Sequence, residues 1–552
     1  MVQMDPRRGS ALAPLGVPIF RRIWTSSLLS NFGHLILGVA AAWEMTRLSD
    51  STVMVALVQT ALMAPLMLVA LPAGALADMF DRRKIALAGL ALACCAGCVL
   101  AAVGFAGLIT PWLLLGLLFV IGAGVALYGP AWQSSISELV PVTHLPSAVA
   151  LGSVSYNLAR SFGPAVGGVI VLAAGAQAAF AVNALGYIPL LLAIFFWRRE
   201  HISSRLPPER LNRALVSGLR YARHASSVRN ALVRSFLFGF AGATSTAMAP
   251  LIAQDVLNGD AAVYGLLLGA SGVGAVLGSL VTTAARDRLG PENAIRCATF
   301  AAAAALIGIG ISTLIWLSAA LFLVQGAMTM LVFSMLNIGI QLSTPRWVLA
   351  RALSLFSASV TGGVAIGAVL WGGLADQIGI PAIMIISGSV LGVTMSLGFV
   401  LPLRREISGQ SEQVAIDNQP NTALALTPRS GPIVIEIDYR VALDSARDFY
   451  QAMQSVGETR RRNGGFNWSL SRDIAVPQLW TERYICPTWG DYLHLRDRYT
   501  KADMEAQERV EALNSLHDDS RIRRRLERPY GSVRWRSDTP DSGTDMASVL
   551  AP

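Results

Sequence analysis

The chain has 552 residues, of which 53% are hydrophobic and only 14% are charged. Soluble domains carry about 25% charged residues, so this composition excludes an ordinary soluble protein and indicates an integral membrane protein. The net charge of +9 is uneven, because residues 1–406 hold 25 Lys and Arg against 14 Asp and Glu, whereas residues 407–552 hold 19 against 21. The basic excess therefore belongs to the membrane part, where it sets topology, and no nucleic-acid partner is expected.

The apolar part falls into twelve segments, each long enough to cross a bilayer, which takes about 20 apolar residues. They predict an all-α membrane protein built as two six-helix bundles, one within residues 1–200 and one within residues 231–405. Residues 201–230 between them predict a cytoplasmic linker, with an amphipathic helix on the inner membrane surface that extends to Arg234. The expected helices are residues 23–46, 53–77, 85–107, 111–135, 146–174, 178–197, 231–254, 261–285, 293–315, 318–342, 350–375 and 381–403.

Arginines mark one side of this helix array. With the N-terminus inside, the loops on the inner side collect nearly all of the basic residues, and the opposite side collects only Arg47. The positive-inside rule then predicts both termini in the cytoplasm and a multi-pass protein of the bacterial inner membrane. The lipid bilayer, protons and a small-molecule substrate are its expected partners.

The stretch from Gly74 to Lys84 places five charges between two apolar runs, which predicts a tight loop between the second and third helices. Its G-x-L-A-D-x-x-D-R-R-K pattern resembles the signature loop of the major facilitator superfamily, and the Asp-Arg-Arg version resembles the branch that contains the enterobactin exporter. That resemblance implies the two-bundle major facilitator fold and a latch that holds the two halves closed on the cytoplasmic side. Alternatively, the loop only collects positive charge, as short cytoplasmic loops do. The latch residues implied are Gly74, Asp78, Asp81, Arg82 and Arg83.

The fifth expected helix contains a G-P-x-x-G-G pattern that begins three residues after an arginine. This pattern resembles a motif typical of antiporters in the same superfamily, which implies export, although Ala150 and Ala159 stand where the longer motif prefers glycine. Alternatively, the proline only kinks the helix and the glycines only pack. The residues concerned are Arg160, Gly163, Pro164, Gly167 and Gly168.

Arg160 lies about 14 residues into its helix, roughly 21 Å at 1.5 Å per residue, and so near the middle of the bilayer. A charge at that depth is costly and is a functional candidate by default. Glu44 is the acidic residue at the closest expected depth, and Asp255 is the second choice. We therefore predict that Glu44 takes up and releases a driving proton, with its pKa tuned by Arg160. Alternatively, Glu44 only reaches the outer interface.

In the major facilitator superfamily, the first, fourth, seventh and tenth helices line the substrate cavity. By that resemblance, the polar residues of these helices are candidate substrate contacts. Polar residues also bond across helix interfaces, and that alternative stays open for each of them. The candidates are Asn31, His34, Tyr128, Gln133, Ser245, Gln325 and Asn337.

The chain after residue 405 predicts a linker at 406–432, a soluble domain at 433–530 and a disordered tail at 531–552. Alternating and helical patterns in the soluble domain follow the order β-α-β-β-α-β, which is typical of a ferredoxin-like α+β sandwich. The expected strands are residues 433–439, 466–472, 479–486 and one opening at 522, and the expected helices are residues 442–462, 489–499 and 502–513.

The soluble domain also carries a resemblance, in Arg460 to Trp468 and in His494 to Arg498. Both runs resemble the tails of the long bacterial exporters called transmembrane secretion effectors, which look like dimeric antibiotic-biosynthesis monooxygenase domains. This implies self-association through the tail and makes His494 a candidate site residue. Docking or dimerisation is favoured over catalysis, and we expect a protein that is not an enzyme and that uses no metal or cofactor.

Together these features predict a proton-coupled transporter that exports a small organic molecule, such as a siderophore, a drug or another amphipathic compound, by alternating access. Two alternatives stay open. In the first, the tail is an enzyme of the monooxygenase type that modifies or captures the cargo. In the second, the protein is a solute importer.

Overall fold

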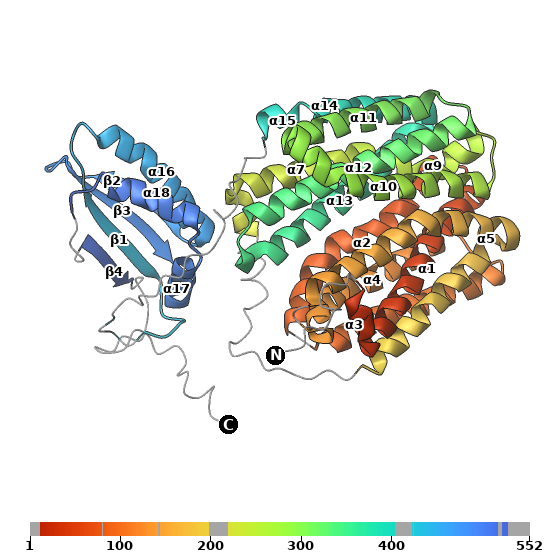
Figure 1. Ribbon diagram of the computed structural model, residues 1–552, viewed down its shortest axis with the longest axis horizontal. Helices are drawn as coiled ribbons and strands as arrows, with labels where there is room; N and C mark the ends of the chain where they lie inside the picture. The colour runs from red at the N-terminus through yellow and green to blue at the C-terminus, as the bar shows by residue number, and fades with distance from the viewer. Residues whose placement is uncertain are drawn as a thin grey trace, which may run out of the picture. The chain divides into compact units, whose positions relative to one another are not determined.

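The computed structural model describes residues 12–79, 81–141, 144–197, 219–402, 422, 424, 426–516 and 521–527. The chain divides into two compact units, which are considered one at a time. The first unit comprises Met1–Ala214, Asn230–Gly339 and Leu353–Leu403, and the second comprises Leu215–Arg229, Ile340–Ala352 and Arg404–Pro552. Figure 1 shows the long helices of the first unit and the sheet of the second.

Long apolar helices build the first unit. Among the described residues, ten helical stretches are long and apolar enough to cross a membrane. Most of these helices begin at a proline or at a polar N-cap. Thr110 and Asp260, for example, accept hydrogen bonds from the backbone of the first turns of their helices. The helices are α1 Pro18–Leu48, α2 Thr52–Met79, α3 Arg82–Phe105, α4 Pro111–Leu139, α5 Leu145–Phe195, α7 Ser226–Gly242, α8 Thr244–Ala247, α9 Ala249–Leu251, η3 Ile252–Val256, α10 Ala261–Leu289, α11 Pro291–Ile311, α12 Ile315–Ser343, α13 Arg346–Ile378, α14 Ile380–Thr394 and α15 Leu397–Val400, preceded by the short η1 Ala13–Gly16.

Helix α5 consists of two helical runs that meet at Gly175, whose φ of 82° is not helical. Glycine adopts this left-handed conformation without the penalty that a Cβ would bring. The two runs match the separate expected helices at 146–174 and 178–197. The ten membrane-capable stretches count α5 as a single one and do not include α1, which has 31 residues.

The prediction that the amphipathic linker helix extends to Arg234 is wrong. Residues 219–224 are helical, and α7 begins at Ser226, so Arg234 belongs to α7. The Arg234 side chain is 5% exposed and its Nη1 lies 2.9 Å from Glu292 Oε2. A buried arginine is tolerated inside a helix when a carboxylate neutralises it. The part of the predicted linker helix before residue 219 lies outside the described residues.

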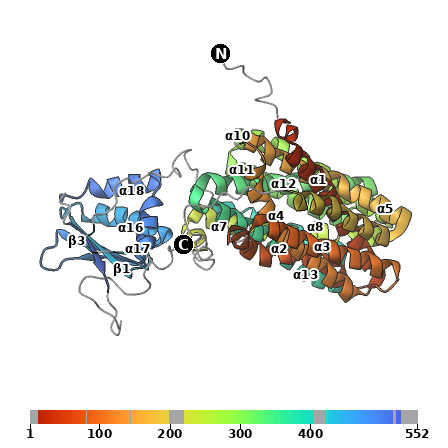
Figure 2. The same cartoon turned by 90° about the horizontal axis from the view of Figure 1, so that it is seen from below.

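The C-terminal part of the second unit is a four-stranded antiparallel sheet with the strand order β2-β3-β1-β4. Its elements follow the expected β-α-β-β-α-β order, with two short helices in the second crossover. Figure 2 shows α16 and α18 over one face of the sheet. The elements are β1 Ile433–Arg440, α16 Ala446–Asn463, β2 Phe466–Arg472, β3 Leu479–Cys486, α17 Trp489–Asp497, α18 Lys501–Glu511 and β4 Ile522–Leu526.

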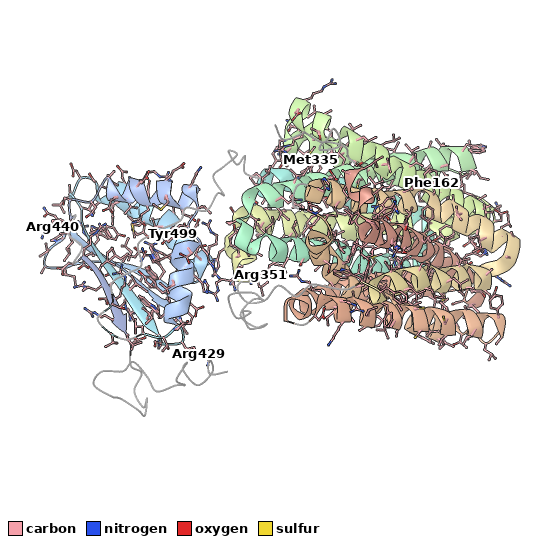
Figure 3. The ribbon with its side chains drawn as sticks, turned by 60° about the horizontal axis from the view of Figure 1, so that its bottom comes forward. Phe162, Met335, Arg351, Arg429, Arg440 and Tyr499 are labelled. Atoms are coloured by element: carbon pink, nitrogen blue, oxygen red, sulfur yellow. The ribbon has the colours of Figure 1, made fainter. Side chains whose placement is uncertain are left out.

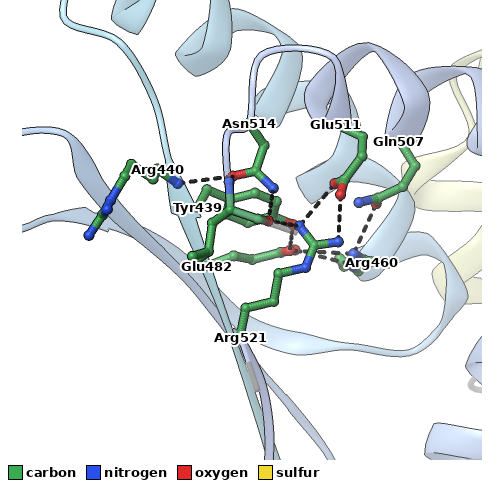
Figure 4. Close-up of polar contacts among 9 residues, drawn as sticks. Tyr439, Arg440, Arg460, Glu482, Gln507, Glu511, Asn514 and Arg521 are labelled. Atoms are coloured by element: carbon green, nitrogen blue, oxygen red, sulfur yellow. Dashed lines mark hydrogen bonds and ion pairs between the residues drawn. The ribbon is translucent and has the colours of Figure 1, made fainter. Parts of the chain in front are cut away.

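A buried charged network crosses the interior of this domain (Figure 4). Glu482 on β3 is fully buried, and its two carboxylate oxygens accept hydrogen bonds from Arg460, Tyr439 and Trp468 at 3.0 Å each. Burial alone would lower the pKa of Arg460, but Glu482 beside it raises that pKa overall. Burial and Glu482 also raise the pKa of Tyr439, so its hydroxyl stays protonated and donates. Each of these four side chains therefore has a hydrogen-bond partner, and such a satisfied network stabilises the interior of the domain.

Candidate functional site

The long helices of the first unit have two ends, which define two faces of the unit. The Thr52 face is the end at which α2 begins, and the Arg82 face is the end at which α3 begins. Because consecutive helices run in opposite directions, α13 ends at the Thr52 face, and Ile378 is its last residue. Contacts between the N-terminal helices (α1 to α5) and the C-terminal helices (α7 to α15) determine which face is closed.

At the Thr52 face, the end of α13 caps the beginning of α2. Asp376 Oδ1 accepts hydrogen bonds from the Thr52 backbone nitrogen at 2.8 Å and from Thr52 Oγ1 at 2.6 Å, and Asp376 Oδ2 accepts one from Ser51 Oγ at 3.2 Å. Thr52 Oγ1 also lies 2.7 Å from the Gly372 carbonyl oxygen. A carboxylate at a helix N-terminus satisfies free backbone N–H groups and complements the positive end of the helix dipole. We call Asp376, Thr52 and Ser51 the Asp376 latch.

The sequence prediction missed this latch, although a signal for it is present. Gly372 to Asp376 reads G-G-L-A-D, and Gly74 to Asp78 reads G-A-L-A-D. The same G-x-L-A-D pattern therefore ends α13 at the Thr52 face and ends α2 toward the Arg82 face. Recognising the repeat would have placed an acidic cap at both faces.

Small residues bring α5 and α10 into backbone contact between the two sets of helices. A Cβ at Gly168 would lie 2.6 Å from the Ala261 carbonyl oxygen and 2.9 Å from the Gly265 Cα. A Cβ at Gly272 would lie 2.6 Å from the Ser161 Cα. Helices in a membrane approach this closely only where side chains are small.

The neighbouring glycines of the G-P-x-x-G-G motif face another helix. A Cβ at Gly163 would lie 3.0 Å from the Leu35 Cβ, and one at Gly167 would lie 3.2 Å from the Ile36 Cα, both on α1. The backbone oxygen of Pro164 lies against Gly265 of α10. The motif therefore packs α5 between α1 and α10, as the packing alternative predicted, and its role in antiport stays a prediction.

Glu44 lies beside the contact between the two sets of helices. Its neighbour Trp43 stacks on Tyr264 of α10, with ring centroids 6.3 Å apart and an interplanar angle of 18°. The Glu44 residue is 6% exposed, and its Oε2 has no hydrogen-bond donor among the described residues. Its Oε2 pairs with Arg47 Nη1 at 3.5 Å, on a side chain that is 64% exposed. Glu44 is thus a nearly buried carboxylate next in sequence to a residue that joins the two sets of helices.

Arg160 occupies the side of α5 that faces away from lipid. Leu158, Phe162 and Val169, on the opposite side of the helix, are 40%, 52% and 60% exposed, as a lipid-facing row would be. Of these residues, Figure 3 labels Phe162 among the side chains of the helical unit. Arg160 itself is half-buried, and its guanidinium forms no ion pair or side-chain hydrogen bond with the described residues. An arginine that is turned inward at mid-depth fits a hydrated path or an anionic ligand better than a structural role.

The structure does not bring Arg160 and Glu44 together. Asn31 on α1 donates to Ser155 Oγ on α5 at 3.1 Å, and Gly163 packs on Leu35, so Arg160 lies level with residues between 31 and 35. Glu44 is about ten residues further along α1, roughly 15 Å at 1.5 Å per residue. The predicted charge interaction is therefore not formed in this conformation, and Glu44 lies beside Arg47 instead. Counting residues from the start of each helix gave the wrong relative depth, because α1 and α5 are offset along their axes.

At the Arg82 face, Asp81 and Arg83 of the predicted latch make hydrogen bonds within the N-terminal helices. Asp81 caps α3 by accepting a hydrogen bond from the Arg83 backbone nitrogen at 3.0 Å. Arg83 Nε donates to the Ile194 carbonyl oxygen at 3.2 Å, and its Nη2 donates to that of Phe195. Arg83 thereby ties the start of α3 to the end of α5. The surroundings of Gly74 and the side chain of Asp78 lie outside what the structure describes.

Several predicted substrate contacts bond within their own set of helices. Asn31 bonds Ser155, and His34 Nδ1 lies 3.4 Å from the Tyr187 hydroxyl of α5. Ser245 Oγ donates to the Gly242 carbonyl oxygen one turn back. Tyr128 stacks on Trp132 with ring centroids 6.4 Å apart. Asn31 and His34 therefore bond across a helix interface, as the alternative describes, whereas the contacts of Ser245 and Tyr128 lie within their own helical runs.

The remaining candidates have different surroundings. Gln325 is 3% exposed, and its Oε1 has no hydrogen-bond partner among the described residues. Asn337 is half-buried, and Asp255 is exposed in η3. The side chain of Gln133 lies outside the described residues. A buried amide oxygen without a donor is costly, which makes Gln325 the strongest polar candidate of this group.

Loss of the Asp376 latch is expected to loosen the Thr52 face. We expect Asp376→Ala to shift the equilibrium away from the closed face by about 2- to 30-fold, the range for a lost helix N-cap. Asp376→Asn should keep most of the closure, because Asn caps helices as well as Asp does. The measurement is the rate of cross-linking, by a short bismaleimide, between cysteines placed at the exposed positions Asp50 and Gln377. Equal rates in the wild type and in Asp376→Ala would contradict a latch at this position.

Comparison with known proteins identifies the family. A family described as transmembrane secretion effector matches residues 9–530 of the chain, which is most of its length. The chain belongs to the transmembrane secretion effector family. This family is part of the major facilitator superfamily of transporters, as the signature loop indicated.

Relatives of this transmembrane secretion effector are bacterial transporters. It is 23% identical to the uncharacterized MFS-type transporter YfiS of Bacillus subtilis, over 70% of this chain and 92% of the relative. It is 22% identical to the staphyloferrin A transporter of Staphylococcus aureus, over 52% and 72%. It is 24% identical to macrolide efflux protein A of Streptococcus pyogenes, over 44% and 60%. The chain is therefore similar to efflux proteins and to a siderophore transporter.

Solved structures agree on the fold of the helical unit. The chain is similar to an auto-inhibited peptide transporter of the POT family with a TM-score of 0.58 and 11% identity, over 73% of this chain and 99% of that one. At this identity the likeness concerns the fold alone. The chain is thus a multi-pass bacterial membrane transporter, and its N-terminal and C-terminal helices are in contact at the Thr52 face.

Proposed function

We propose that the protein is a proton-coupled exporter that moves a small organic molecule, such as a siderophore, a drug or another amphipathic compound, across the bacterial inner membrane by alternating access. Counting α5 as two helices and adding α1 to the membrane-capable set gives twelve crossings in two six-helix bundles. The arginine distribution supports an orientation with both termini and the Arg82 face in the cytoplasm and the Thr52 face outside.

The observation that carries this proposal is the placement of Glu44. The carboxylate is nearly buried one residue from Trp43, whose stacking on Tyr264 joins the two bundles. Separation of the bundles at the Thr52 face would break this stack and expose Glu44 to water. Proton uptake by Glu44 is thereby tied to the opening of one face, which is the coupling that a secondary transporter requires.

The two G-x-L-A-D sequences support a reciprocal mechanism. When the Thr52 face is closed, Asp376 caps the beginning of α2. When the Arg82 face closes, Asp78 at the end of α2 would cap the beginning of α13 in the same way, because α2 and α13 run side by side in opposite directions. Each acidic cap then stabilises one of the two states.

The proposal is tested by transport into inverted membrane vesicles whose interior is acidified. Export in the cell corresponds to accumulation in these vesicles, and we expect at least one compound from a panel of carboxylate siderophores and macrolides to accumulate only when the interior is acidic. Accumulation that occurs only in right-side-out vesicles would identify an importer instead. Accumulation that persists without a proton gradient would contradict proton coupling.

For the tail, we propose docking or self-association in a ferredoxin-like domain. The buried polar groups Arg460, Glu482 and Tyr439 bond to one another and present no free reactive group to a bound molecule. A domain of this kind supports the transporter by contact. Oxygen consumption or chemical change of cargo by the full-length protein would favour the enzyme-linked alternative.

A further inference from the structure

A basic hollow of about 400 Å³ lies within the second unit, where residues 219–224 meet the sheet domain. A ligand site of this size matches the lower range of small-molecule pockets. Its walls come from the short helix, from α16, from the start of β2 and from the residue after β3. The lining residues are Arg220, His224, Arg461, Gly465, Phe466, Asn467 and Pro487.

Positive charge dominates the hollow. Arg220, Arg461 and the adjacent Arg223 all act on His224, and Glu458 is the acidic residue that opposes them. Partial burial, followed by these three arginines, lowers the pKa of His224, so its imidazole is neutral near pH 7. A bound anion would counter this repulsion and favour the protonated imidazole of His224, which would donate a hydrogen bond to the anion.

The walls of the hollow are held in place. Tyr221, next to Arg220, is 3% exposed, and its hydroxyl donates to the Ser343 carbonyl oxygen at 3.4 Å. The Arg462 guanidinium lies 6.0 Å from the centre of the Tyr221 ring and pairs with Asp503. These contacts orient the short helix so that Arg220 and His224 face Arg461.

The floor of the hollow is a tight backbone turn. Gly464 has a φ of 124°, and Asn467 has a φ of 51°, which is unusual for a residue with a side chain. A Cβ at Gly464 would lie 3.3 Å from Arg220 Nη1, so a glycine here lets the guanidinium approach the turn. Phe466, which is 39% exposed, adds an apolar wall.

We propose that this hollow binds the phosphate group of a phosphate ester. Two guanidinium groups and an imidazole can surround a phosphate, and the arginine fork matches phosphate oxygens better than an ammonium does. Phe466 and Pro487 suit the carbon part of the ester. The phosphate can come from a soluble organophosphate or from an anionic phospholipid headgroup. A ligand in this site would link residues 219–224, which belong to the segment between the two bundles, to the sheet domain.

The test uses the purified full-length protein and two arms that distinguish the sources. In the first arm, inorganic phosphate and glycerol 3-phosphate are titrated into the protein in detergent, and binding is measured by calorimetry. In the second arm, thermal stability is compared in nanodiscs of pure phosphatidylcholine and in nanodiscs with phosphatidylglycerol. Binding in the first arm identifies a soluble ester, and stabilisation only in the second identifies the lipid headgroup.

The decisive comparison is among arginine variants. We expect Arg220→Gln and Arg461→Gln each to weaken binding by about 10- to 100-fold, as expected for a lost charged hydrogen bond. Arg447→Gln is the matched control, because it removes an exposed arginine from α16, the helix that carries Arg461. This control should not change the binding affinity. Arg461 also contacts Trp468, so Arg220→Gln decides the question if Arg461→Gln unfolds the tail. No binding in either arm, or equal binding by Arg220→Gln and Arg447→Gln, would overturn the proposal.

Discussion

Replacement of Glu44 by Gln is expected to abolish proton-driven transport while leaving the protein folded. Gln has nearly the same shape as a protonated Glu and cannot release a proton, so coupling to the gradient is lost. The fold should survive because Glu44 Oε2 has no hydrogen-bond donor among the described residues and its ion pair with Arg47 is exposed on one side. The measurement is the accumulation rate in acid-inside inverted vesicles, which should fall at least about tenfold, whereas exchange of cargo across a membrane without a gradient should continue.

Asp260→Asn provides the matched control. Asp260 is an exposed carboxylate at the start of α10, where it accepts hydrogen bonds from Ala262 N at 3.0 Å and Val263 N at 3.1 Å. Asn fulfils the same capping role, so transport should continue at the wild-type rate. Undiminished proton-driven transport in Glu44→Gln would remove Glu44 from the mechanism, and equal losses in both variants would point to a general effect of charge at this face.

Replacement of Gly272 by Ala should separate α5 from α10. The added Cβ would lie 2.6 Å from the Ser161 Cα and 2.9 Å from the Arg160 carbonyl carbon, and these backbone atoms cannot move without moving the whole helix. Overpacking of this kind costs about 1–3 kcal/mol. We expect a lower midpoint of thermal unfolding in detergent and a transport rate reduced by about tenfold or more, because the closed Thr52 face depends on this contact.

Gly152→Ala on α5 is the control, since a Cβ there meets no atom within 4 Å. It should leave both the unfolding midpoint and the transport rate close to the wild-type values. If Gly272→Ala is as stable and as active as Gly152→Ala, then the α5 and α10 contact is not essential to the closed state.

Much of the fold follows from periodicity in the sequence. The strands Phe466–Arg472 and Leu479–Cys486 were predicted at their observed bounds, because polar turns flank them on both sides. The break in α5 was also predicted, as the gap between the expected helices at residues 146–174 and 178–197, and the non-helical Gly175 lies in that gap. The predicted linker helix ended in the wrong place because Arg234 looks solvent-exposed in sequence and is in fact neutralised by Glu292.

The site was less accessible to sequence reasoning, because it depends on which helices meet and at what offset. Glu44 and Arg160 were selected as charged residues within apolar helices, and their roles stay predictions, but whether they pair depends on the register between α1 and α5. Asp376 was missed because one acidic residue at a helix end is ordinary until its contact with Thr52 is known. Repeated sequence, in this case G-x-L-A-D, was the available signal.

Alternating access is tested most directly by two distances measured in one protein preparation. Spin-label pairs on a cysteine-free background would report on the Thr52 face, at the exposed positions Leu108 and Thr313, and on the Arg82 face, at Lys84 and Asp287. We predict that conditions which protonate Glu44 lengthen the first distance and shorten the second. Two distances that stay fixed, or that change in the same direction, would contradict the account.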